Sequence, residues 1–293
     1  MLFNKKENDM SEPIRPEDYA EPRCPLCDPK YGEEGMIRPV PQQRIIEKMN
    51  EYMSRRDYAG AERHLLYWLE EAKIGRDEGG ELLIRNELIG HYRKTGDREK
   101  ALANCERAIE LLDKLDLYGS TTCGTTCVNA GTAMNAFGEN ERAMELFTKA
   151  KKTYESRRDT SPELLGGLYN NMALTCVSLR RFEEAFLYYR KALLQMEQVP
   201  GGELEQAITY LNMADAAAAE KGPEEGEGQI GTYLDLAAKL LQTENAPRDG
   251  YYAFVCEKCA PAFEYYGYFL DAERLKKEAE EIYERNGART GVL

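Results

Sequence analysis

Three asparagines recur at matching positions of consecutive apolar, helix-like segments. They are Asn129, Asn171 and Asn212, separated by 42 and 41 residues. The carbonyl of an asparagine side chain accepts hydrogen bonds and its amide donates them, so a row of asparagines can hold an extended backbone whatever its side chains. Asparagine is also unfavourable inside a helix relative to alanine. We interpret the three as a candidate peptide-binding ladder; the alternative is that they tie neighbouring loops together.

Four further polar residues extend this candidate surface. Asn170 directly precedes Asn171, and Asn135 lies about two helical turns beyond Asn129. Glu87 is expected in the ladder position one unit earlier, and Asp215 follows Asn212 by almost one turn. Because carboxylates attract cations, these two acidic residues favour a ligand with basic character.

The cysteines are the next candidates for chemistry. Eight are present, including the pairs Cys24-Pro-Leu-Cys27 and Cys256-Glu-Lys-Cys259. The first pair resembles half of a zinc knuckle, in which two thiolates supply two of four tetrahedral ligands. The second pair falls where other units place core residues, which favours packing. We predict no metal site, with Cys24 and Cys27 as the only weak candidates.

Residues that would build an active site are missing from the sequence. Only two histidines occur, His64 and His91, and neither has the serine, cysteine or aspartate spacing of a catalytic triad. No glycine-rich phosphate loop, HExxH or GxSxG motif is present. We therefore predict no catalytic residue, no enzymatic activity and no cofactor.

The composition restricts the class of partner. Of 293 residues, 42% are hydrophobic and 31% charged, which is typical of a soluble globular protein. The net charge of −13, from 39 basic and 52 acidic residues, disfavours nucleic acid and anionic membranes and leaves a protein or peptide partner. The first residues have no apolar segment typical of a signal peptide, and no apolar run is long enough to span a membrane. We expect a cytoplasmic protein with reduced thiols.

The elements that must position the asparagines are repeated helix pairs. Gly96, Gly138 and Arg180 mark corners spaced by 42 residues, and each precedes an alanine by five residues. Seven residues further on, a second position recurs as alanine or tryptophan. These two positions comprise Ala61, Ala101, Ala143, Ala185 and Ala272, then Trp68, Ala108, Ala150, Ala192 and Ala279. Small residues at this spacing let two helices approach closely, and such hairpins must stack because none can bury its apolar face alone.

This pattern resembles the tetratricopeptide repeat (TPR) family. A period of 42, longer than the usual ~34 residues, and the segment YNNMA at Tyr169 are similar to the kinesin-light-chain type. The resemblance implies an all-α, right-handed superhelical solenoid of about six helix-turn-helix units, with the first helix of each unit on the concave face. We expect an irregular segment over 1–40, a solenoid over 41–286 and a tail over 287–293. The insertion GPEEGEG in the fifth unit predicts either a solvated loop or a bend.

The resemblance also implies function. TPR proteins of this type hold extended peptides on asparagine ladders, and the correspondence falls on Asn129, Asn171 and Asn212. The leading hypothesis is an adaptor that binds a segment of another protein. One alternative is a regulator like the bacterial TPR receptors for signalling peptides, although the first 40 residues are short and proline-rich for their extra N-terminal domain. Another is a zinc-stapled structural subunit. The oligomeric state and the identity of the partner stay open.

Overall fold

The structure, a computed structural model, describes residues 37–243 and 247–290, and over these residues it is all-α. It contains twelve helices in six consecutive hairpins, as predicted. Their bounds are α1 Gln42–Ser54, α2 Tyr58–Ile74, α3 Glu78–Thr95, α4 Arg98–Lys114, α5 Thr121–Ala136, α6 Asn140–Ser156, α7 Pro162–Ser178, α8 Phe182–Met196, α9 Glu203–Lys221, α10 Glu227–Leu241, α11 Gly250–Tyr265 and α12 Phe269–Thr290. The last helix thus continues four residues beyond the expected end of the solenoid at 286.

Each hairpin turns at one residue with a positive φ. In chain order these residues are Arg56, Gly96, Gly138, Arg180, Gly222 and Gly267, with φ between 57° and 85°. The left-handed conformation ends a helix in few residues and favours glycine, which lacks the Cβ clash. The corner of the first unit, at Arg56, therefore forms without a glycine.

Aspartates at the corners start the next helices. Asp57 accepts a hydrogen bond from the Gly60 amide at 2.7 Å, and Asp97 accepts one from the Lys100 amide at 3.1 Å. These are N-caps, in which a side-chain oxygen satisfies an amide that has no partner within the helix. The residues at these corners therefore account for both the end of one helix and the start of the next.

The alanine stripe is where the two helices of each hairpin meet. Ala101, Ala143 and Ala185 are fully buried, and so are the alanines seven residues after each of them. In the fifth unit the two positions are taken by Ile230 and Ala237, both buried. The stripe thus continues through the unit whose sequence departs most from the repeat.

The insertion in the fifth unit is a short solvated corner. The helix α9 ends at Lys221, Pro223 to Glu225 are exposed, and α10 begins at Glu227. The hairpin itself is preserved, because α9 and α10 pack against each other along their length. Of the two predicted outcomes, the structure shows the loop and not a bend that breaks the unit.

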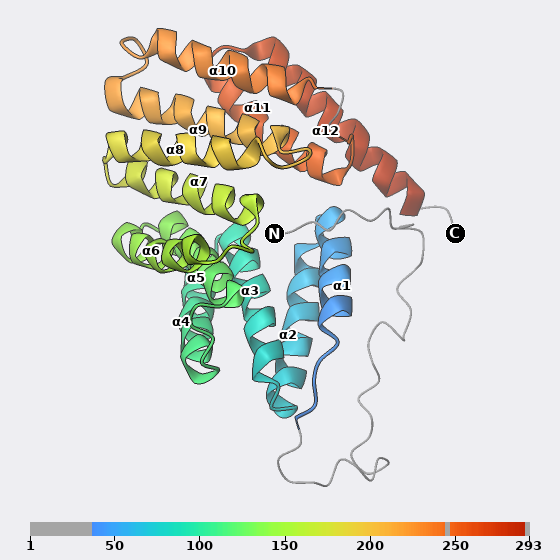
Figure 1. The fold of residues 1–293 in the computed structure, drawn as a ribbon. Helices are drawn as coiled ribbons and strands as arrows, with labels where there is room; N and C mark the ends of the chain where they lie inside the picture. Colours follow the sequence, from blue (N-terminus) through green and yellow to red (C-terminus); the bar gives the residue numbers. More distant parts are fainter. Residues whose placement is uncertain (1–36, 244–246, 291–293) are drawn as a thin grey trace.

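The hairpins stack along a curve, which Figure 1 shows from α1 in blue to α12 in red. Each odd-numbered helix from α3 onward packs directly against the next odd-numbered helix, α3 on α5, α5 on α7, α7 on α9 and α9 on α11. Helices on the inside of a curved stack lie closer together than those outside, so the odd-numbered helices form the concave side. This side carries the asparagines.

Candidate functional site

The predicted ladder residues all lie on odd-numbered helices. Asn129 and Asn135 belong to α5, Asn170 and Asn171 to α7, and Asn212 to α9. All five side chains are half-buried, as expected for polar groups on a concave wall. The register of the repeats thus brings them to neighbouring helices of one face.

Asn129 is paired with an asparagine of the preceding unit that the sequence analysis missed. Its Nδ2 donates to Oδ1 of Asn86 on α3 at 2.9 Å. Asn86 in turn donates to the Leu82 carbonyl at 2.9 Å and to Thr126 Oγ1 at 3.0 Å. The position expected for Glu87 is therefore occupied by Asn86, one residue earlier. A helix rotates by about 100° per residue, so Glu87 does not face Asn129 as Asn86 does.

A second pair joins the next two inner helices. Asn212 Nδ2 on α9 donates to Asn170 Oδ1 on α7 at 3.1 Å. This bond spans 42 residues, close to the 43 that separate Asn86 from Asn129. The two pairs are equivalent cross-links between successive repeats, so part of the ladder does tie the protein together.

Asn171 has no such cross-link. Its side chain makes no hydrogen bond with the part of the chain that the structure describes, and its backbone carbonyl accepts from Thr175 Oγ1 at 3.1 Å. Asn135, at the end of α5, has a buried Oδ1 that finds no partner among the described residues. Asn171 therefore leaves hydrogen-bonding capacity unused on the inner side, whereas the unpaired oxygen of Asn135 is buried.

The pairing leaves a defined set of free groups. Asn129 and Asn212 each use one amide hydrogen and keep Oδ1 as an acceptor, whereas Asn170 uses Oδ1 and keeps its amide as a donor. Asn171 keeps both its side-chain oxygen as an acceptor and its amide as a donor. A peptide backbone presents one donor and one acceptor per residue, which matches this mixture of free acceptors and donors on α5, α7 and α9.

Three carboxylates with raised pKa values lie on the inner helices. Burial raises the pKa of Glu87 on α3 and of Glu205 on α9, and the charge of Lys258 partly offsets this effect at Glu205. Burial also raises the pKa of Asp215, against the hydrogen bond of 2.8 Å that it accepts from Tyr266. Desolvated carboxylates of this kind are stabilised by an approaching cation. Sequence analysis missed Glu205, although it precedes Asn212 by two turns on α9.

One cation on an inner helix also has a shifted pKa. Burial lowers the pKa of Arg93, and among the described residues no carboxylate forms an ion pair with it. Arg93 lies in the last turn of α3, where a positive charge complements the helix dipole. The concave side therefore has mixed charge, with carboxylates on α3 and α9 and this arginine at one end of α3.

The histidines and thiols are parts of the core. His64 and His91 are buried, and burial lowers the pKa of each imidazole. Cys256 and Cys259 pack in the core of the last hairpin, where burial raises the pKa of each thiol to about 12. The described residues contain no group of three or more metal-ligating side chains. Cys24 and Cys27 lie outside the described residues.

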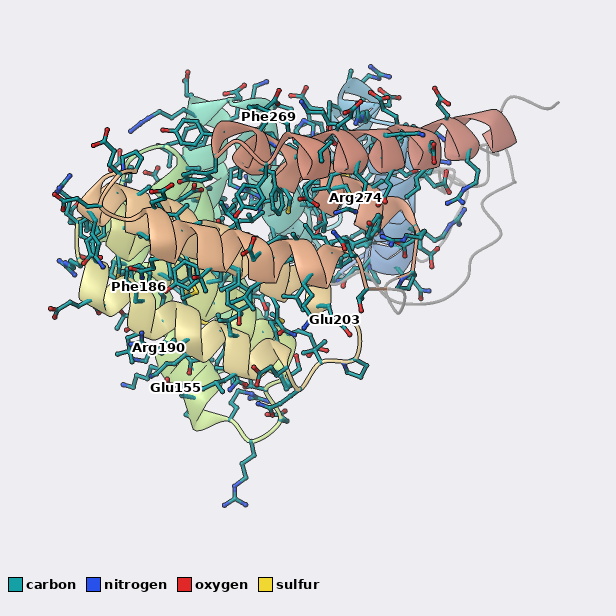
Figure 2. The ribbon with its side chains drawn as sticks, turned by 90° about the horizontal axis from the view of Figure 1, so that it is seen from above. Glu155, Phe186, Arg190, Glu203, Phe269 and Arg274 are labelled. Atoms are coloured by element: carbon teal, nitrogen blue, oxygen red, sulfur yellow. The ribbon has the colours of Figure 1, made fainter. Side chains whose placement is uncertain are left out.

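Shallow depressions lie on the side of the even-numbered helices. One of about 320 Å³ lies over α8 to α10 and is lined by Phe186, Arg190 and Tyr233 among others. Figure 2 labels Phe186 and Arg190 on α8. None of the asparagines of the ladder lines it. In the described part of the chain, no helix is both long and apolar enough to cross a membrane.

Of the comparisons with known proteins, only the one with solved structures finds similar proteins. No family model matches it, and no curated protein matches it. One similar structure is that of BtubC (BKLC) from P. vanneervenii, at 17% identity over 87% of this chain and 94% of that one, with a TM-score of 0.47. Another is a putative kinesin light chain from Podosopora anserina with nearly identical TPR-like repeats. It is 14% identical over 69% of this chain and 94% of that one, and its TM-score is also 0.47. The six registered hairpins, rather than these superpositions, make the chain a solenoid of TPR-like repeats.

Proposed function

We propose that the chain is a protein-interaction module that binds an extended segment of a partner along its concave side. The observation that carries the proposal is the row of unpaired amide groups on α5, α7 and α9, left free after the asparagines have cross-linked their helices. Asn171 adds a free donor and a free acceptor on α7, one residue after Asn170, the residue that is cross-linked to Asn212.

The charge of the inner helices supports a ligand with basic side chains. Glu87, Glu205 and Asp215 are held at raised pKa by burial, and a lysine or arginine of the ligand would relieve their desolvation. The net charge of −13 adds a long-range attraction for such a ligand. Binding should therefore weaken as salt is added.

A selection from a random peptide library tests the proposal. The full chain is immobilised, displayed peptides are selected, and the affinity of the best peptide is measured for the wild type and for Asn171→Ala and Asn212→Ala. Selected peptides should be enriched in lysine and arginine, and both variants should bind them more weakly.

Gln195→Ala is the matched control. Gln195 is a half-buried amide on α8, an even-numbered helix outside the concave side. Its loss should leave the affinity unchanged. If Gln195→Ala weakens binding as much as Asn171→Ala, or if the selected peptides are acidic, the peptide does not lie on the asparagine row.

A further inference from the structure

The first and last hairpins of the solenoid touch each other. Arg56, at the corner between α1 and α2, donates through Nη2 to Glu257 Oε1 on α11 at 2.7 Å, across 201 residues of sequence. The Arg56 guanidinium also lies 4.3 Å from the ring centre of Tyr283 on α12. Figure 1 shows this corner of the blue hairpin directed at the red α11–α12 pair. The curve of hairpins therefore returns on itself.

A second cation lies near an aromatic ring of the same last hairpin. Lys94, in the last turn of α3, has its Nζ 5.2 Å from the ring centre of Phe254 on α11 and 5.1 Å from that of Tyr58 on α2. Tyr283 adds a hydrogen bond of 3.3 Å to Glu257. The closing contact thus combines one ion pair with two cation–π contacts across the ends of the chain.

This contact differs in kind from those between neighbouring hairpins. Neighbours share buried apolar cores, whereas Arg56, Lys94, Phe254 and Glu257 are all exposed. The side chains of Arg56 and Glu257 keep 50% and 51% of their solvent exposure. Ion pairs between such exposed groups are weak and are screened by salt. The ends can separate without disrupting any apolar core.

We propose that Arg56, Glu257, Tyr283, Lys94 and Phe254 form a salt-sensitive clasp that closes the solenoid into a ring. When the clasp opens, the first hairpin moves away from α11 and the concave side becomes accessible from the gap. A role in admitting a peptide rests on the proposed function, whereas closure itself is a property of the free protein and is tested without ligand.

Small-angle scattering of the full chain measures closure. We compare about 10 mM with about 1 M salt, between which the screening length falls from roughly 30 Å to roughly 3 Å. The radius of gyration of the wild type should rise with salt, that of Arg56→Glu should be high throughout, and Arg56→Glu with Glu257→Arg should restore the wild-type response. Arg98→Glu, which breaks an exposed ion pair between adjacent hairpins, is the control and should not expand the protein.

A cross-link provides an independent readout. In Arg56→Lys the charge is kept, and a zero-length carbodiimide can join Lys at 56 to Glu257. The joined peptide should be found by mass spectrometry at low salt and be lost at high salt. Absence of the cross-link at low salt, or a radius of gyration that Arg56→Glu leaves at the wild-type value, overturns the clasp.

Discussion

Two asparagines on the same side of the solenoid have opposite roles at the scale of single residues. The side chain of Asn86 makes three hydrogen bonds within the protein, whereas that of Asn171 makes none with the described residues. A polar group that the fold satisfies internally stabilises the fold, and one that it leaves free is available to a ligand. Substitution by alanine should separate these roles.

We expect Asn171→Ala to weaken a library-selected peptide by about tenfold, since each lost hydrogen bond is worth about 0.5–1.5 kcal/mol. Its free energy of unfolding should stay close to wild type, because alanine is the better helix former. Asn86→Ala should instead lose about 1–3 kcal/mol of stability, as Asn129 and Thr126 lose their partner. Urea unfolding and fluorescence anisotropy measure the two quantities. A destabilised Asn171→Ala would make Asn171 a structural tie.

The buried imidazole of His91 makes stability depend on pH. Burial lowers the pKa of His91 below the ordinary value of about 6.5 for a histidine, so the unfolded chain takes up a proton at a higher pH than the folded one. The contribution of this group is complete above pH 6.5 and is lost as the pH falls below it, by at most about 1.4 kcal/mol per pH unit. In urea unfolding between pH 7.5 and 5.5, His91→Gln should lose less stability than the wild type. Parallel curves would contradict this.

At the scale of elements, close helix contact depends on the alanine stripe. Ala185 is fully buried among the side chains of the large core. A leucine there adds three carbon atoms to a filled space and should cost about 1–3 kcal/mol. The urea midpoint of Ala185→Leu should therefore fall, whereas Leu187→Ala, at an exposed position of the same helix, should change little. Equal midpoints for Ala185→Leu and wild type would place the stripe elsewhere.

The elements could be predicted from the sequence because their signals are local. A glycine at the corner marks the end of one helix, and an N-capping aspartate marks the start of the next. An alanine five residues after the corner marks the buried face of the second helix. The spacing from Gly138 predicts the corner at Arg180, although arginine gives no signal of its own for a left-handed residue.

The partners across repeats could not be predicted in the same way. Whether Asn86 or Glu87 meets Asn129 depends on the rotation of α3 against α5, and a shift of one residue turns the side chain by about 100°. A repeat of about 42 residues fixes that rotation only to within a residue or two. The contact of Arg56 with Glu257 depends on curvature summed over six hairpins, for which no local pattern exists.

At the scale of the whole molecule, the described residues form two buried cores instead of one. The smaller core gathers apolar side chains of α1, α2 and one side of α3, together with Ala101. The larger core begins on the other side of α3, with Leu82 and Ile89, and continues to Ile282 on α12. In a stack where each unit contacts its neighbours, stability is approximately a sum of units and interfaces. A substitution in the smaller core should therefore destabilise the helices around that core and leave distant hairpins unchanged.

Leu65→Ala tests this division, because Leu65 is fully buried in the smaller core and its loss should cost about 2–5 kcal/mol there. Hydrogen exchange followed by mass spectrometry should show faster exchange in α1 and α2, with α9 and α10 as in the wild type, since no apolar contact links them to the cavity. The direct contacts that the described residues make across the gap, at Arg56 and Lys94, are exposed and too weak to carry the loss into α11 and α12. Equal acceleration in all six hairpins would mean that the solenoid unfolds as one cooperative unit despite its separate cores.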